Sequence, residues 1–318
     1  MVHGNINKDN TIFKILKYYY IDDLTQVEIA AKLNITRVSV SRLLSKAKED
    51  GLIEHRIKYP KNFIFDRNEE LEEKLKKKYK LKECIIICSR DNRTEIIIEL
   101  SNQLEKLFTN ISCDHTFIGV GWGVTLDRIV EYINITDKKD VKVVPLVGGY
   151  GKLFDNRHSN NIARVLAEKF DGISYTVNVP ALLDSKEIRE SIQKDSTTKE
   201  IYGFAKRVET ALLCMSDLSK ESTLYKSGQL DEEDLHYLEG LGVIGDINFI
   251  FIDKEGKSVP NEISERQTIF FPIEQMKSAK NVIGMVVGKR KAEILKAVLK
   301  GGLINILLCD EDAASMSI

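Results

Sequence analysis

The sequence predicts an α/β protein with two domains: an N-terminal all-α winged helix-turn-helix and a larger C-terminal Rossmann-like α/β domain. The chain has 318 residues, 43% of them hydrophobic, and is longer than one average domain. Apolar residues recur at helical spacing in the first 50 residues. Beyond residue 80, short apolar runs alternate with helical stretches. We place the boundaries at 1–58, 59–80 for a linking helix, and 81–318.

The charge is nearly balanced but unevenly distributed. The chain has 47 Lys and Arg against 48 Asp and Glu, whereas residues 1–60 hold ten against seven. A small domain with net positive charge, attached to a remainder with net negative charge, is suited to binding phosphate groups. The longest apolar runs, such as 282–287, are far below the roughly 18 residues of a membrane span, and the N-terminus lacks a secretory apolar region. We expect a cytoplasmic protein with no membrane partner.

The five cysteines are scattered, with no CxxC pair and no nearby histidine cluster of zinc spacing. We interpret them as reduced core residues. The sequence therefore predicts neither a metal nor a cofactor.

Two helices are expected before residue 35. Apolar positions at helical spacing predict the first over 11–20. Thr25 stands three residues before Glu28, which is the spacing of a capping box, and Asn34 suits the left-handed residue after a helix. The buried face of the second helix is predicted to be Val27, Ala30, Ala31 and Leu33.

A third helix follows, capped by Thr36. Its inward stripe is predicted to be Val40, Leu43, Leu44 and Ala47. The opposite face carries hydroxyls and cations: Arg37, Ser39, Ser41, Arg42, Ser45 and Lys46. Such groups can contact base edges and phosphates in a major groove. Gly51 closes the helix, and apolar or neutral residues alternate with charged ones over 53–58, as in a wing strand. The alternative is a small three-helix packing unit with a solvated cationic face.

The segment 66–80 begins acidic and ends basic, which complements a helix dipole and predicts the linking helix. Leu71, Leu75 and Tyr79 form its narrow apolar edge, which is compatible with dimer contacts. Its lysine run indicates a solvated helix end, with a second DNA contact as the alternative.

Apolar runs beyond residue 80 predict strands at 83–88, 117–120, 141–147, 173–177, 211–215, 249–252, 282–287 and 305–309. Uniformly apolar strands with intervening helices indicate a mainly parallel sheet covered on both faces. Ligands of such sheets bind beyond the carboxyl ends of the strands.

Glycine clusters follow three of these strands. The first, 119–125, includes Gly121, Gly123, Val124 and Thr125, and could hold a phosphate at a helix N-terminus. It lacks the acidic residue expected for NAD. The second holds Gly148 and Gly149 and is followed by His158. This polar segment is explained equally well by a ligand contact and by a simple helix cap and loop. The third, 284–291, ends in Lys291. Its spacing is one residue short of a P-loop and no Ser or Thr follows the lysine, so nucleotide hydrolysis is disfavoured.

The segment 24–53 resembles the DNA-binding segment of the SorC family of sugar-responsive bacterial regulators, and 119–125, 144–149, 242–247, 287–292 and 301–313 are similar to later motifs of that family, in the same order. The resemblance implies that Gln26 contacts the DNA backbone and that Thr36, Arg37, Ser39 and Arg42 contact the operator. It implies an effector domain like sugar-phosphate isomerases and deaminases that acts as a sensor. The positions matching phosphate-holding sites are Gly121, Gly123, Thr125 and Lys291, and those facing the sugar are Asp246 and His158.

We therefore expect a transcriptional regulator of carbohydrate genes, with repression favoured over activation. Its expected partners are double-stranded operator DNA, a phosphorylated sugar or polyol, and further copies of the chain in a dimer or tetramer. One alternative is a sugar-phosphate isomerase or deaminase that uses Asp246, His158 or Asp310 as general base. Another is an architectural DNA-binding protein with a vestigial second domain.

Overall fold

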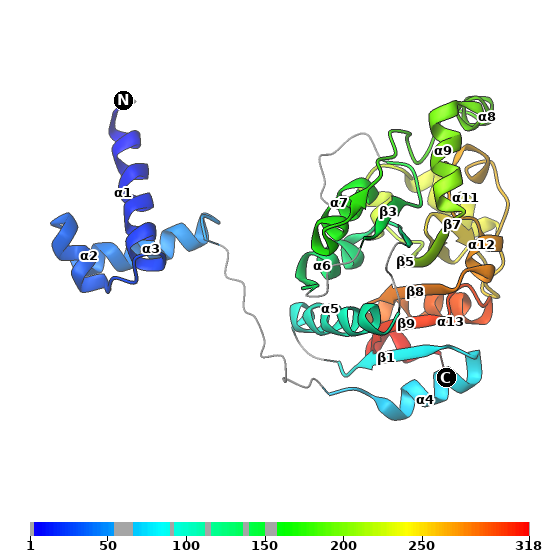
Figure 1. Cartoon of the computed structure of the whole chain (residues 1–318), viewed down its shortest axis with the longest axis horizontal. Coiled ribbons are helices and arrows are strands. Elements are labelled where there is room, and N and C mark those ends of the chain that lie inside the picture. Colours follow the sequence, from blue (N-terminus) through cyan, green and yellow to red (C-terminus); the bar gives the residue numbers. More distant parts are fainter. Residues whose placement is uncertain are drawn as a thin grey trace. The chain divides into compact units, whose positions relative to one another are not determined.

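The computed structural model describes residues 3–53, 66–89, 92–111, 116–135, 140–149 and 158–317, and in the first helix it describes side chains from residue 10 onward. The chain divides into two compact units, residues 1–64 and 65–318 (Figure 1).

The N-terminal unit contains the three predicted helices, which are α1 (His3–Tyr20), α2 (Gln26–Leu33) and α3 (Arg37–Glu49). The capping box before α2 is confirmed, because the Glu28 carboxylate accepts from the Thr25 amide at 2.8 Å and Thr25 Oγ1 accepts from the Glu28 amide at 3.3 Å. Asn34 follows α2 in the left-handed region, with φ of 51°. These local signals turn the chain tightly between α2 and α3.

The small core of this unit is formed by Ile15, Ile29, Ala30, Val40 and Leu44. The inward stripe of α3 is confirmed. The predicted buried face of α2 was partly wrong, because Ile29 is fully buried whereas Val27 is 61% exposed and Ala31 is exposed. In a helix of two turns, the stripe that contains Val27 and the stripe that contains Ile29 both satisfy helical spacing. Only packing against α1 and α3 selects the stripe of Ile29 for burial. The predicted wing, 53–58, lies outside the described residues except for residue 53.

The second unit is built on a parallel sheet in the order β1-β9-β8-β5-β2-β3-β4. This confirms the predicted α/β class. The strands are β1 (Glu83–Ile87), β2 (Phe117–Val120), β3 (Lys142–Pro145), β4 (Ile173–Ser174), β5 (Val208–Asp217), β8 (Asn281–Val286) and β9 (Ile306–Asp310). The short strand β6 (Gly245–Ile247) pairs antiparallel with the end of β5 and was not predicted. The run predicted at 249–252 is β7 (Ile250–Ile252), which pairs antiparallel with β6 instead of entering the parallel order.

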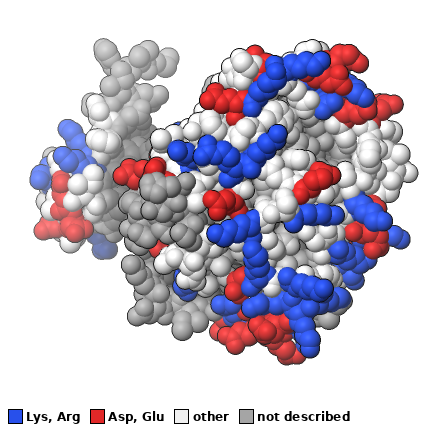
Figure 2. All heavy atoms as spheres, turned by 45° about the vertical axis from the view of Figure 1, so that its right-hand side comes forward, with Lys and Arg blue, Asp and Glu red and all other residues white. Residues whose placement is uncertain are grey.

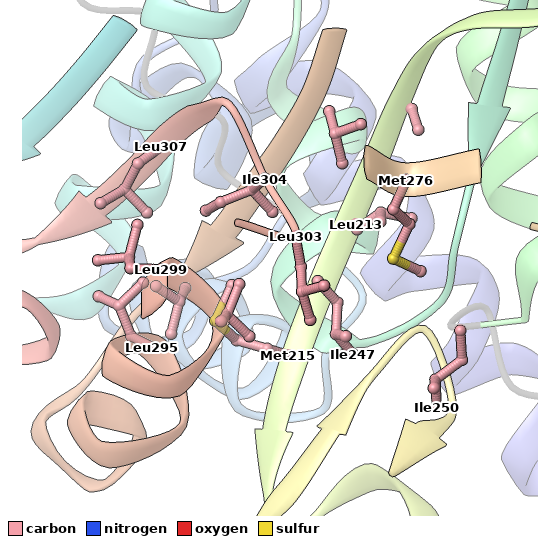
Figure 3. Packing of buried hydrophobic residues seen from close by; sticks show 14 of the residues in the cluster. Leu213, Met215, Ile247, Ile250, Met276, Leu295, Leu299, Leu303, Ile304 and Leu307 are labelled. Carbon is pink, nitrogen blue, oxygen red and sulfur yellow. The ribbon is translucent and has the colours of Figure 1, made fainter. Parts of the chain in front are cut away.

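Helices cover both faces of the sheet (Figure 1). One large hydrophobic cluster joins the sheet to α5 (Arg93–Asn110), α6 (Val124–Tyr132) and α7 (Ser159–Phe170). The other joins it to α4 (Glu69–Tyr79), α9 (Ser196–Ala205), α12 (Ile273–Ser278), α13 (Ala292–Lys300) and α14 (Glu311–Ala314). Figure 3 shows part of the second cluster, where Leu295 and Leu299 of α13 lie close to Met215 of β5 and Leu307 of β9. Further helices are α8 (Lys186–Lys194), α10 (Thr223–Lys226) and α11 (Glu232–Gly240), with 3-10 turns η1 (Ser264–Arg266) and η2 (Lys289–Lys291).

The predicted linking helix, α4 (Glu69–Tyr79), belongs to the second unit. Leu75 is fully buried in the core there. Buried Glu72 accepts from the Ile86 amide of β1 at 2.8 Å, and the Tyr79 hydroxyl donates to the Ser317 carbonyl at 2.8 Å. The apolar edge of α4 is therefore covered by its own chain, and the second unit begins near residue 65 instead of at residue 81.

Candidate DNA-binding surface and effector cavity

The solvent-facing side of α3 carries the predicted DNA contacts. Arg37, Ser41, Arg42 and Lys46 are exposed, opposite the buried stripe. Ser39 is half-buried, as is Gln26 at the start of α2. No carboxylate follows Thr36 until Glu49, so the first three turns of α3 present only neutral and positive groups to a partner. This surface is electrostatically suited to a polyphosphate backbone.

Two of the predicted contact residues also fix the start of α3. Thr36 Oγ1 accepts from the Ser39 amide at 3.1 Å and lies 2.9 Å from Ser39 Oγ. The threonine thus satisfies one of the free amides of the first turn. The hydroxyls of Thr36 and Ser39 already bond to each other. Either hydroxyl must therefore bond to DNA in addition to its bond within the helix cap. Sequence periodicity places the two residues on the surface but does not reveal this pairing.

Charges on the second unit are intermixed. Figure 2 shows Lys and Arg side chains interspersed with Asp and Glu over the face in view. This agrees with the near-neutral total of the chain.

A cavity of about 740 Å³ opens at the carboxyl ends of β2, β5 and β8. From β2 the chain proceeds to β3 and β4 on one side, then returns to β5 and continues to β8 and β9 on the other. The cavity therefore lies at the point where strand order reverses, which is the usual ligand site of open parallel sheets. Its lining includes Arg93, Trp122, Gly123, Val124, Thr125, Arg128, Cys214, Ser216, Glu221, Thr223, Lys226, Asp246, Gly288, Lys289, Arg290 and Lys291.

The N-terminus of α6 forms one wall. Gly123 precedes the helix with φ of 121°, a conformation that favours glycine, and within the described residues no side chain caps this end. Thr125 Oγ1 is buried and has no hydrogen-bond partner among the described residues. Free amides, the helix dipole and an unpartnered hydroxyl together suit an anion. The predicted residues Gly123, Val124 and Thr125 are thus brought together at the cavity.

The turn η2 and the loop before it form the opposite wall, and the end of β9 holds this loop in place. Both carboxylate oxygens of Asp310 accept from the Gly288 amide at 2.9 Å, and Oδ1 also accepts from the Ala313 amide at 3.1 Å. Lys291 lies on this wall, and burial lowers its pKa. A bound phosphate would compensate for the desolvation of its ammonium group.

Asp246 of β6 lies in the floor of the cavity and is 4% exposed. Its Oδ2 accepts from the Phe249 amide at 2.8 Å. Burial raises the pKa of Asp246 to about 7, against the opposing effects of that hydrogen bond and of the positive charge of Lys291. Near neutral pH this carboxyl can accept or donate a hydrogen bond, as recognition of a sugar hydroxyl requires.

Several further cavity residues were not predicted. Arg93 at the start of α5 and Arg128 on α6 add positive charge. Arg290 is paired at the cavity, at 3.0 Å from Asp217 and 3.2 Å from Glu221. Burial raises the pKa of Cys214 to about 11, so its thiol is neutral. No local sequence signal distinguishes these side chains from ordinary surface cations and a core cysteine, because only strand order brings them to one cavity.

Four predicted effector residues do not appear among the described residues that line this cavity. Gly121 packs so closely that an added Cβ would lie 2.8 Å from Asn248 Oδ1. Gly148 donates to the Thr268 carbonyl at 3.0 Å, and Gly149 is covered by the ring of His158. His158 Nδ1 accepts from the Asn160 amide at 3.1 Å and caps α7, while burial lowers the pKa of the ring. Their place in effector binding stays a prediction.

The possible enzymatic bases are also separated. Of Asp246, His158 and Asp310, only Asp246 lines the cavity. The Asp310 carboxylate accepts hydrogen bonds from the Gly288 and Ala313 backbone amides. Among the described residues, no group of three or more His, Cys, Asp or Glu side chains is arranged to hold a metal ion. In the same part of the chain, no helix has the length and apolar character needed to span a membrane.

Comparison with known proteins identifies both units. Residues 65–317 match the family model described as "Putative sugar-binding domain", and residues 17–73 match the Crp-like helix-turn-helix domain. The chain is 28% identical to the deoxyribonucleoside regulator of Bacillus subtilis and 29% identical to the sorbitol operon regulator of Klebsiella pneumoniae, in each case over 96% of both chains.

The crystal structure of the full-length sorbitol operon regulator SorC from Klebsiella pneumoniae superimposes with a TM-score of 0.72, covering 97% of this chain and 98% of that one. The match of 65–317 spans most of the chain, and the alignments with both relatives extend over 96% of each protein. The chain therefore belongs to the SorC family of regulators, in which a helix-turn-helix precedes a sugar-binding domain.

Proposed function

We propose that this protein is a DNA-binding transcriptional regulator of carbohydrate genes, and that a phosphorylated sugar or polyol in the cavity controls its affinity for an operator. In this proposal the protein is a repressor and a homo-oligomer. More than one copy is required because two helix-turn-helix units are needed to reach two half-sites. The ligand must bind the DNA-competent and DNA-released arrangements with different affinities.

The observation that carries the proposal is that Gly123 and Thr125 on one wall, Lys291 on the other and Asp246 in the floor line the same cavity, where Thr125 Oγ1 has no partner among the described residues. A phosphate would supply the partner that Thr125 Oγ1 lacks and would neutralise Lys291. Asp246 would then face the uncharged part of the ligand and discriminate among hydroxyl patterns. The volume of about 740 Å³ is ample for a sugar phosphate.

The test is a thermal-shift screen of phosphorylated sugars and polyols, each paired with its unphosphorylated parent. We expect only phosphorylated compounds to raise the melting temperature, and the same compounds to release operator DNA in a fluorescence-anisotropy titration. If the parent sugars bind equally well, the phosphate-binding role of Thr125 and Lys291 is contradicted.

A pair of isosteric variants sharpens the test. Thr125→Val removes an unpartnered hydroxyl inside the cavity, whereas Thr268→Val removes an equally buried and unpartnered hydroxyl whose residue is not among those lining the cavity. We expect Thr125→Val to weaken ligand binding about tenfold, the value of one hydrogen bond to a charged group. Thr268→Val should leave the affinity unchanged.

The buried Asp246, with a pKa of about 7, would also suit a general acid or base. The same panel addresses this alternative when product formation is followed for each compound. Turnover of a sugar phosphate at an ordinary enzymatic rate would overthrow the sensor proposal, and binding without turnover would support it.

A further inference from the structure

We infer that Val38 of α3 reads the operator by packing against the 5-methyl group of a thymine in the major groove. This inference rests on the proposed DNA binding by α3. Val38 is 76% exposed and does not belong to the hydrophobic cluster of its unit. Isolated surface valines are common in folded proteins, and Val38 is distinguished by the polar and cationic surface around it.

Val38 lies on the solvent-facing side of α3, in the first turn of the helix. Ser41, Arg42 and Ser45 are three, four and seven residues further on, and all are exposed. At 3.6 residues per turn they lie on the same side of the helix as Val38. The buried residue Val40 is two positions away, about 200° around the helix axis. A duplex that contacts the exposed side of α3 at its N-terminal end therefore contacts Val38.

Helix stability does not account for a valine at this position. A β-branched side chain has lower helix propensity than alanine, and an exposed one gains little from burial. The neighbouring hydroxyls and guanidinium groups can bond to phosphates or base edges, but the two methyl groups of Val38 cannot. Their contribution must come from an apolar partner.

The major groove offers one such partner on its base edges, the thymine 5-methyl group, since the other exposed groups are hydrogen-bond donors and acceptors. The absence of carboxylates between Arg37 and Lys48 favours approach of a duplex to this surface. Charge thus brings the helix to DNA without reading its sequence, and Val38 supplies a sequence-dependent contact in the first turn of the helix.

Replacing thymine by uracil removes only the methyl group and so tests the contact directly. A high-affinity duplex is first selected from genomic fragments by the full-length protein. Each thymine is then replaced in turn, and Kd is measured at one fixed salt concentration. We expect about fourfold weaker binding at one thymine per half-site, corresponding to the burial of one methyl group.

Two variants make the assignment specific. Val38→Ala should weaken binding to the thymine duplex by a similar factor and abolish the sensitivity to uracil at that position. Val27→Ala is the matched control, because Val27 is an exposed valine of the same unit, on α2. It should retain the full uracil sensitivity.

The inference is overturned if the wild-type protein is indifferent to uracil at every position, or if Val38→Ala keeps the wild-type pattern. These outcomes differ from a failure of the proposed function, in which no duplex would be enriched in the initial selection. Since alanine is the better helix former, loss of folding is not expected for Val38→Ala, and circular dichroism checks this.

Discussion

The two units present their candidate functional residues in different ways. In the N-terminal unit most of these residues lie on one 13-residue helix, α3, whose buried stripe determines which side faces outward. In the second unit Thr125, Asp246 and Lys291 come from distant segments and meet only because β2, β5 and β8 are neighbours in the sheet. A surface on one helix depends on local periodicity, whereas a cavity depends on strand order.

The difference in core size gives the prediction with the largest effect. The small unit relies on few buried side chains, and Ile15→Ala should cost about 2–5 kcal/mol, a large part of its stability. We expect loss of operator binding while ligands still raise the melting temperature of the second unit. Leu212→Ala, in the large core, is the reciprocal variant and should reduce ligand binding first. If the two substitutions have the same effects, the units are not separate.

The next prediction concerns the cavity alone. Lys291→Met keeps much of the side-chain length and removes the charge, so affinity for a phosphorylated ligand should fall by about 10- to 100-fold. Operator affinity without ligand should be unchanged, and release by ligand should require correspondingly higher concentrations. Isothermal titration calorimetry and anisotropy measure the two quantities. Full retention of ligand affinity would remove Lys291 from the phosphate site.

Arg42→Ala is the corresponding change on α3. Loss of one phosphate or base contact should weaken operator binding by about 1–3 kcal/mol. If the contact is to phosphate, the slope of log K against log salt should also decrease by about one. Ligand affinity is expected to stay at its wild-type value. An unchanged affinity and slope would contradict our placement of α3 on the duplex.

The last prediction is a pH dependence of stability that arises in the cavity. The pKa of Asp246 is about 7 in the folded protein, against an ordinary value of 3.8. Between these values the folded state binds more protons than the unfolded state, so this residue's contribution to the free energy of unfolding is present at low pH and is lost as pH rises through about 7.

The variant Asp246→Asn removes this contribution. From pH 5 to 7.5 its free energy of unfolding should fall less than that of the wild type, by up to about 1.4 kcal/mol per pH unit. Chemical denaturation at several pH values measures the difference. Parallel pH profiles for the two proteins would show that Asp246 is ionised throughout.

Much of the local structure was predictable from the sequence. The capping box of Thr25 and Glu28, the left-handed Asn34 and the inward stripe of α3 depend on residues within a few positions of one another. Two features that failed were not local. The choice between Val27 and Ile29 was made by packing against other helices, and the place of α4 was decided by its contacts with β1.

The sequence by itself determined the helix-turn-helix, the polar face of α3, the parallel α/β class and the glycine turns after the strands, because each depends on short-range periodicity or backbone preference. Only the tertiary structure decided that Thr125, Lys291 and Asp246 share a cavity with Arg93, and that Gly149 and His158 pack against each other outside its described lining. The physical reason is that strand order, set by burial of both sheet faces, brings together residues that no sequence spacing relates.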